Sequence, residues 1–190
     1  MSWSNRPLNP NSKRYKLACF LSSLITGHRI QHMNQWGGFN AATINVLVHN
    51  GKVLMGKRAS FLDRAGQYSL MGGYIEPDIV ESFAEGAARE IIEECHIAID
   101  PDDLILLAQG KAPKIYHRVK TKYHAETHNI IAVFVYVLTD DEAAMAAPSN
   151  EMDPLVWLSI SDVVAYAKES KLAFKEDLLI LKKAHAAGYF

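Results

Sequence analysis

Gly72-Gly73-Tyr74-Ile75-Glu76, followed by Glu81 and by Arg89-Glu90-Ile91-Ile92-Glu93-Glu94, is the stretch that decides how this chain folds. The glycine pair predicts a tight turn, and the residues after it predict a helix with a dense acidic face. Residues three and four apart on a helix are neighbours, so Glu90, Glu93 and Glu94 are expected to project to one side. Carboxylates this close repel one another unless a cation lies among them, and Mg²⁺ prefers oxygen ligands.

The same helix also has an apolar side, which is expected to face a core because its members recur at helical spacing. These members are Phe83, Ala84, Ala87, Ala88, Ile91 and Cys95. At roughly 100° per residue, Glu90 and Glu94 fall at the edge of this apolar stripe. Acids beside a core fit a half-buried metal site, whereas a solvated acidic face is the alternative for an E-x-x-E-E pattern considered by itself.

The spacing of these residues resembles the signature of the Nudix (MutT-like) hydrolases, G-x5-E-x7-R-E-U-x-E-E-x-G-U with U apolar. Glu81 and the stretch from Arg89 to Glu94 match the signature in identity and spacing, and Ile97 matches its last apolar position. The glycine pair and Glu76 match the turn that commonly precedes the helix in this family. The resemblance therefore rests on several residues at fixed spacing rather than on the acidic run alone.

Two departures from the signature concern the ends of the helix. Gly73 and Glu81 are separated by seven residues rather than five, which indicates a two-residue insertion around Asp78-Ile79-Val80. His96 stands where the family has glycine. Because glycine at that position supplies a left-handed cap, a different helix end is expected here. Neither departure removes a carboxylate.

The expected elements agree with the α+β fold class and the α/β/α sandwich with a mixed sheet that the resemblance implies. Strands are predicted at residues 42–49, 52–58, 68–70, 104–109, 114–120, 129–138 and 155–158, with a hairpin turn at Asn50-Gly51. Helices are predicted at about 80–95, 159–167 and 174–187, and another from residue 11 or 12 to residue 25. We divide the chain into an N-terminal helical extension, residues 1–38, and a Nudix hydrolase domain, residues 39–190.

The resemblance implies hydrolysis of a nucleoside diphosphate linked to another group, with Mg²⁺ as cofactor and Mn²⁺ as a substitute. Glu90 and Glu94, one helical turn apart, are the expected metal ligands. Glu93 is either a third ligand or the base that takes a proton from water, so Glu93 and Glu94 are the catalytic candidates. The carbonyl of Gly72 is the expected backbone ligand, because glycine lets the chain approach an ion closely.

The other motif residues, Gly73, Glu81 and Arg89, are expected to hold the loop to the helix rather than to take part in chemistry. A carboxylate near the helix start is also favoured by the helix dipole. These three residues are therefore interpreted as structural.

Substrate contacts are expected outside the motif as well. Arg58 ends a predicted strand, and its guanidinium suits a phosphate, although a solvated strand end explains it equally well. Relatives often take a further acid from outside the motif. Glu126 and Glu151 are the candidates, and both are predicted to lie in loops, where a glutamate is more often solvent-exposed.

Composition limits the remaining function classes. The chain has 190 residues, 49% of them hydrophobic, and a formal net charge of −1, so no global field attracts it to nucleic acid or to a membrane. The basic residues between 111 and 122 either protect a hairpin edge or steer a polyphosphate or RNA. The apolar run Leu17–Ile25 is too short to span a bilayer. Two cysteines without a C-x-x-C motif favour a reducing cytoplasm.

Several functions remain open at this point. Gly56-Lys57-Arg58 favours a substrate of the nucleoside triphosphate or nucleotide-sugar type. The alternatives are an ADP-ribose or NADH pyrophosphatase and a non-catalytic Nudix-fold nucleotide sensor, although sensors tend to lose the acids that are intact here. A homodimer formed through the N-terminal extension is compatible with each of these functions.

Overall fold

The computed structural model describes residue 17 and residues 39–76, 80–107, 114–120 and 125–190. These belong to two compact units, residues 1–41 with 114–130 and residues 42–113 with 131–190. Leu17 is helical. The rest of the predicted N-terminal helix, its use as a dimer arm and the path of the insertion at residues 77–79 lie outside the described residues.

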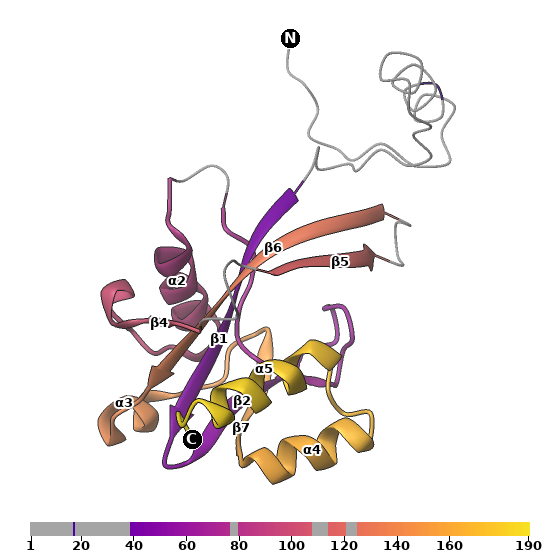
Figure 1. Cartoon of the computed structure of the whole chain (residues 1–190). Coiled ribbons are helices and arrows are strands. Elements are labelled where there is room, and N and C mark those ends of the chain that lie inside the picture. Colours follow the sequence, from indigo (N-terminus) through magenta and orange to yellow (C-terminus); the bar gives the residue numbers. More distant parts are fainter. Residues whose placement is uncertain (1–16, 18–38, 77–79, 108–113, 121–124) are drawn as a thin grey trace. The chain divides into compact units, whose positions relative to one another are not determined.

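The elements follow one another in an order that mixes strands with helices (Figure 1). The strands are β1 Phe39–His49, β2 Lys52–Arg58, β3 Tyr68–Ser69, β4 Ile105–Leu106, β5 Lys114–Lys120, β6 Ala125–Val137 and β7 Met152–Leu158. The helices are α2 Phe83–Cys95, the 3₁₀ turn η1 Pro101–Asp103, α3 Asp140–Met145, α4 Ile160–Lys168 and α5 Lys175–Ala186. The predicted hairpin is confirmed, since His49 pairs with Lys52 across Asn50-Gly51.

Several predicted boundaries are wrong, beginning with β1, which starts at Phe39 rather than at residue 42. Helix α2 begins at Phe83 rather than near residue 80, because Ser82 caps it. Strand β4 is shorter than predicted and β7 begins earlier, at Met152. Strand β6 begins at Ala125, so Glu126 lies in a strand and not in a loop. The predicted loop after residue 138 contains α3, which Thr139 and Glu142 open with a reciprocal capping box.

The sheet has the order β3-β2-β1-β6-β4, with β5 paired to β6 and β7 paired to β2. Strand β2 is central to the site because it pairs antiparallel with β1 near the hairpin, with β3 at its other end and with β7 along its length. The chain beyond β3 then continues along β1, where isolated bridges join Asn45 to Met71 and Ala42 to Tyr74. The glycine turn is therefore an extension of the sheet.

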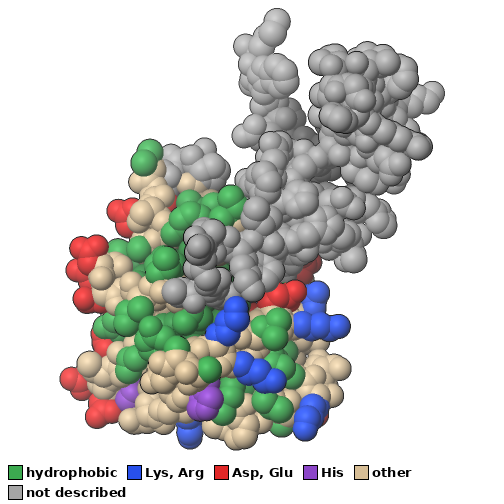
Figure 2. Space-filling model, in the orientation of Figure 1, with side chains coloured by type: hydrophobic (Ala, Val, Ile, Leu, Met, Phe, Trp, Pro, Cys, Tyr) green, Lys and Arg blue, Asp and Glu red, His purple; other side chains and the backbone are tan. Residues whose placement is uncertain are grey.

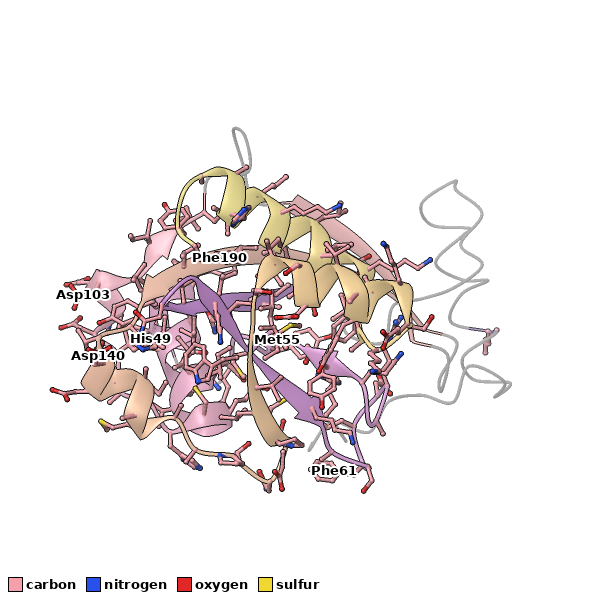
Figure 3. The ribbon with its side chains drawn as sticks, turned by 90° about the horizontal axis from the view of Figure 1, so that it is seen from below. His49, Met55, Phe61, Asp103, Asp140 and Phe190 are labelled. Atoms are coloured by element: carbon pink, nitrogen blue, oxygen red, sulfur yellow. The ribbon has the colours of Figure 1, made fainter. Side chains whose placement is uncertain are left out.

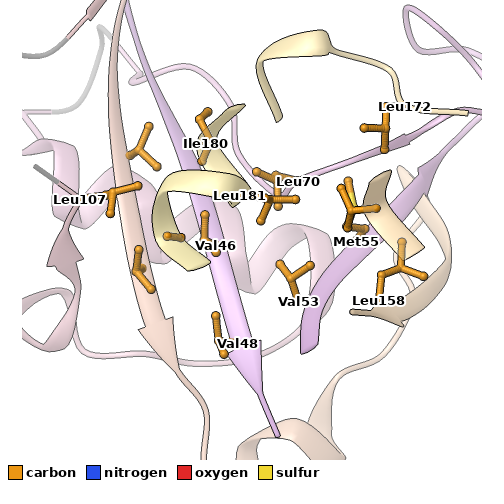
Figure 4. Packing of buried hydrophobic residues seen from close by; sticks show 14 residues of the cluster. Val46, Val48, Val53, Met55, Leu70, Leu107, Leu158, Leu172, Ile180 and Leu181 are labelled. Carbon is orange, nitrogen blue, oxygen red and sulfur yellow. The ribbon is translucent and has the colours of Figure 1, made fainter. Parts of the chain in front are cut away.

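Alternating residues of β1 enter two different cores, as expected of a strand that is covered on both faces. Val46 and Val48 pack in the cluster that includes Ile180 and Leu181 of α5 (Figure 4). Leu47 packs in a second cluster. That cluster also contains Met71, Ile91, Cys95, Ile97 and Met152. Helices α4 and α5 thus cover one face and α2 the other, which confirms the α/β/α sandwich.

The hairpin end of β1 is fixed to α3. His49 Nε2 lies 3.4 Å from Asp140 Oδ1, and the two residues are neighbours in Figure 3. His49 Nδ1 lies 3.2 Å from the carbonyl oxygen of Leu138, and the ring centroids of His49 and Trp157 are 5.7 Å apart.

Within the described part of the chain, no helix is both long and apolar enough to cross a bilayer.

Candidate active site

Helix α2 is fixed at both ends by local hydrogen bonds. At its start, the Ser82 hydroxyl accepts from the Glu85 amide at 3.2 Å, and the Glu85 carboxylate accepts from the Ser82 amide at 2.6 Å. At its end, His96 adopts φ 61° and ψ 22°, and its amide donates to the Ile92 carbonyl at 3.0 Å. The expectation of a different helix end is therefore wrong, because His96 itself takes the left-handed conformation usually given to glycine.

Glu94 is a buried carboxyl group directed at the glycine turn. The residue is 4% exposed, and its Oε2 accepts a hydrogen bond from the Gly72 amide at 2.6 Å. Burial raises the pKa of Glu94 to about 8, and the neighbouring charges of Glu90 and Glu151 act in the same direction. The Gly72 bond and the charge of Arg58 oppose this rise in pKa. A cation beside Glu94 would favour its ionised form.

Glu90 lies against the second glycine of the turn. Its carboxylate occupies the space into which a Cβ atom on Gly73 would project, so only glycine fits there without a shift. The side chain is 13% exposed and pairs with Arg89 Nη1 at 2.9 Å. Burial raises the pKa of Glu90, while Arg89 lowers it. Glu93, in contrast, is 55% exposed and lies 3.4 Å from Arg89 Nη1.

The glycine turn is fixed by the sheet and by α5. Gly72 has φ 141°, and a Cβ atom there would meet the backbone of Thr43, so glycine is required. Strand β1 donates from the amide of Thr43 to the Gly73 carbonyl and from the amide of Asn45 to the Met71 carbonyl, each at 2.8 Å. From the other side, Asp177 Oδ2 of α5 accepts from the Leu70 amide at 3.3 Å. These bonds hold the turn rigidly beside α2.

Glu81 and Arg89 join the segment after the turn to α2. Arg89 Nε and Nη2 donate to the Glu81 carboxylate at 3.2 and 2.9 Å, and Nη2 also donates to the Tyr74 carbonyl at 3.0 Å. Glu81 Oε1 accepts from the Glu76 amide at 2.8 Å. Arg89 lowers the pKa of Glu81, and Glu81 raises the pKa of Arg89. Both charges are thus satisfied within the protein.

The charges of Arg58 and Glu151 both act on Glu94 from outside the motif. Glu151 precedes β7, and its carbonyl accepts from the Ala59 amide at 2.8 Å, which places it beside the end of β2. Its charge raises the pKa of both Glu90 and Glu94, whereas the charge of Arg58 lowers the pKa of Glu94. Glu126 belongs to the other unit of the chain.

The residues present fit a hard divalent cation that is shared with a substrate. Among the described residues, no group of three or more His, Cys, Asp or Glu side chains is gathered closely enough to hold a metal ion alone. The buried carboxyl group of Glu94 and the half-buried carboxylate of Glu90 instead flank the glycine turn. One or two carboxylates completed by substrate phosphates is the donor set typical of Mg²⁺.

Sequence reasoning missed several residues around the site. Asp177 and Phe174 come from a segment far from the motif, and Arg64, which contacts Phe174, comes from the loop after β2. No local pattern identifies them. Thr43 and Asn45 are polar residues in an otherwise apolar strand, which is a usable signal. Thr43 Oγ1 and Asn45 Oδ1 are buried, and neither atom has a hydrogen-bond partner among the described residues.

Comparison with known proteins gives a family match and a shared fold. The model of the NUDIX domain matches residues 39–179. A MutT protein from Methanosarcina mazei Go1 is 24% identical, covering 67% of this chain and 82% of its own, with a TM-score of 0.50. The NUDIX domain of Shewanella oneidensis NrtR, solved in complex with ADP ribose, is 16% identical to this chain. The match covers 79% of this chain and 87% of the NrtR domain, with a TM-score of 0.57.

A third solved structure is a bifunctional NMN adenylyltransferase/ADP ribose pyrophosphatase from Francisella tularensis, in complex with AMP and a Mn ion. It is 14% identical, covering 94% of this chain and 50% of its own, with a TM-score of 0.55. No curated protein matches the chain.

Proposed function

The chain belongs to the Nudix hydrolase family, and from this premise we propose that it is a Mg²⁺-dependent pyrophosphohydrolase that cleaves a nucleoside diphosphate linked to another group. The observation that carries the proposal is the position of Glu94. It is 4% exposed, yet it lies at the glycine turn with Glu90 beside it. Burying carboxylates together is costly unless a cation joins them.

Glu90, Glu94 and the Gly72 carbonyl would hold the cation in this proposal, with Mn²⁺ as a substitute. When bound, a divalent cation neutralises charge on the phosphates and lowers the pKa of a water molecule. Arg58 would bind a phosphate oxygen, since guanidinium groups form paired hydrogen bonds with phosphate. Arg58 and a cation held by Glu90 and Glu94 would together offset the negative charge of the anhydride.

Glu93 is proposed as the base, because its exposed carboxylate can reach water while Glu90 and Glu94 hold the cation. As the water oxygen bonds to phosphorus, its proton passes to Glu93, and the anhydride P–O bond breaks with its electron pair leaving on the departing phosphate. Glu151 is proposed as a further acid near the cation, and Glu126 as a substrate contact from outside the motif. Gly73, Glu81 and Arg89 are proposed to be structural.

Two classes of substrate compete within this function. The nucleoside triphosphate or nucleotide-sugar type is favoured by Arg58 at the end of β2. ADP-ribose is favoured by two solved structures with the same fold, one in complex with ADP ribose and one of a bifunctional ADP ribose pyrophosphatase. A non-catalytic nucleotide sensor is the third possibility, and the intact carboxylates of α2 argue against it.

A substrate panel with a Glu94→Gln variant tests the proposal. The purified chain would be incubated in Mg²⁺ with dNTPs, oxidised dNTPs, ADP-ribose, NADH, dinucleoside polyphosphates and nucleotide sugars. We expect turnover of at least one compound, and a loss of several orders of magnitude in Glu94→Gln without a change of fold. Near-wild-type turnover by Glu94→Gln would remove Glu94 from the mechanism, and no turnover by the wild type would favour the sensor.

Two further proposals concern the context of the chain. We propose a cytoplasmic location, because Cys95 is buried and free rather than part of a disulfide. Burial also raises the pKa of its thiol to about 12. We also propose that residues 1–38 are a helical extension outside the Nudix domain and that they form a dimer arm. The solution mass with and without residues 1–35 tests the arm, and an unchanged mass would exclude it.

A further inference from the structure

Two arginine side chains lie on one aromatic ring beside the site. The guanidinium carbon of Arg58 is 5.3 Å from the ring centroid of Phe174, and that of Arg64 is 5.0 Å from the same centroid. Phe174 directly precedes α5, while the arginines come from the end of β2 and from the loop that follows it. Two segments far apart in the sequence, residues 58–64 and the start of α5, therefore bring two positive charges together.

Arg64 is held in place without a neutralising partner. Its Nη1 donates to the Ala173 carbonyl, and its backbone has φ 59°, a conformation that a residue with a side chain rarely adopts. No carboxylate of the described residues forms an ion pair with it, in contrast to Arg89, which contacts three glutamates. The face of an aromatic ring attracts a guanidinium but leaves its charge intact. The charge of Arg64 on this ring therefore favours an anion.

The two arginines are connected rigidly to the glycine turn. Arg58 Nη1 lies 3.4 Å from Ser69 Oγ, at the end of the strand that leads to the turn. The segment before Phe174 is fixed to the same strand, since the Tyr68 amide donates to the Lys171 carbonyl and the Ala173 amide to the Tyr68 carbonyl, each at 2.8 Å. The charge of Arg58 also acts on Glu94.

Acidic side chains gather along the edge that carries α2 and α3, whereas Lys and Arg side chains lie together with acidic ones over α5 (Figure 2). A ligand that binds both a cation at Glu90 and Glu94 and the two arginines would carry negative charge at both places.

We propose that Arg58 and Arg64, presented on Phe174, bind a phosphate group beyond the cleaved anhydride, so that the substrate is a nucleoside triphosphate or longer polyphosphate. This inference rests on the proposed function. A terminal phosphate offers several charged oxygens to the planar fork of a guanidinium. The sugar of a nucleotide sugar offers only uncharged hydroxyl groups at the same place, so Arg64 would have no anionic group to bind.

Binding of inorganic tripolyphosphate tests the site without catalysis. Calorimetry in EDTA at low salt would compare the wild type with Arg64→Gln, Phe174→Leu and Lys182→Gln. We expect Arg64→Gln to weaken binding about tenfold or more and Phe174→Leu to weaken it about two- to fivefold. Lys182→Gln removes the same charge from an exposed position of α5 and should change binding less than about twofold.

A kinetic comparison tests the substrate class. Arg64→Gln should raise KM for nucleoside triphosphates about tenfold with little change in kcat, and should leave KM for nucleotide sugars and ADP-ribose within about twofold of the wild type. Thermal melting would show that each variant is folded. Absence of tripolyphosphate binding by the wild type, or equal binding by Arg64→Gln, contradicts the proposed site.

The two proposals can fail separately. If the wild type hydrolyses nothing and Glu94→Gln behaves identically, the proposed function fails, while calorimetry still decides whether Arg64 binds phosphate. If only ADP-ribose or nucleotide sugars are hydrolysed, the function stands and the assignment of the substrate class is overturned.

Discussion

Gly73 determines where the Glu90 carboxylate can lie. A Cβ atom at residue 73 would overlap both carboxylate oxygens of Glu90, and Gly73 does not require a left-handed backbone. We therefore expect Gly73→Ala to fold but to displace Glu90 from the turn. Affinity for Mn²⁺, measured by electron paramagnetic resonance, should fall about tenfold or more, as expected for losing a charged ligand.

The matched control for this prediction is a double-mutant cycle with Glu90→Ala. If the alanine acts by displacing Glu90, adding Gly73→Ala to Glu90→Ala should weaken Mn²⁺ binding no further. Equal losses in the two backgrounds would mean that Gly73 acts by another route.

His96 is strained in the position that glycine usually takes. Because it adopts φ 61°, His96→Gly should raise the free energy of unfolding by about 0.5–1 kcal/mol, the left-handed penalty less the chain entropy of glycine. Urea unfolding measures this change. Ala98→Gly, two residues further on, has no positive φ to relieve and should lower stability by a similar amount. A loss of stability in His96→Gly would mean that its side chain makes a needed contact.

At the scale of elements, the sequence predicted those whose signals are local. Strand β2 has the predicted bounds because its apolar residues end at a hairpin turn and a basic pair. Helix α3 was missed although Thr139 and Glu142 have capping-box spacing, because only six residues follow the cap and no apolar period forms. The predicted start of α2 was wrong because a second capping box, formed by Ser82 and Glu85, was overlooked.

The Glu81–Arg89 pair should control the segment between the glycine turn and α2. Glu81→Gln removes the acceptor of the Glu76 amide and one ion pair of Arg89. Amide exchange at Glu76 should therefore become at least about tenfold faster, while exchange in the middle of α2 stays unchanged. Because Arg89 lowers the pKa of Glu81 below 4.5, this protection should persist at neutral pH and be lost as pH falls through the lowered pKa.

Glu93→Gln is the control for this prediction. Glu93 is 55% exposed and lies 3.4 Å from the same guanidinium, but it makes no contact with the Glu76 amide. Exchange at Glu76 should be the same as in the wild type. Faster exchange in both variants would attribute the protection to the net charge around Arg89 rather than to Glu81.

At the scale of the whole molecule, the sequence predicted one side of the site and not the other. Helical spacing, which is a local pattern, predicts Glu90 and Glu94 at the edge of an apolar stripe. Both side chains are largely covered in the structure. The hydrogen bond from the Leu70 amide to Asp177 and the contact of Arg64 with Phe174 join residues more than 100 positions apart. Contacts of this range depend on how the layers pack, and no spacing in the sequence encodes them.

The stability of the metal-free protein should fall as pH rises, which is the reverse of ordinary carboxylate behaviour. The pKa of Glu94 is about 8 in the folded chain, against 4.5 for an unperturbed glutamate. Between these values the folded state holds a proton that the unfolded state has lost. Unfolding free energy in EDTA should therefore decrease by about 1.4 kcal/mol per pH unit from this group.

A divalent cation should oppose this trend because it replaces the proton at Glu94. Saturating Mg²⁺ should stabilise the wild type more at pH 8 than at pH 5, since ligand that binds only the folded state adds RT ln(1 + [L]/Kd). Glu94→Gln keeps the neutral form at every pH, so it should lose both the slope and most of the gain from Mg²⁺. If the wild type in EDTA instead gains stability from pH 5 to pH 8, Glu94 is ionised without a cation. Glu90 and Glu94 could then both be ionised in the folded protein without a metal ion. This result would contradict the proposal that a cation binds between them.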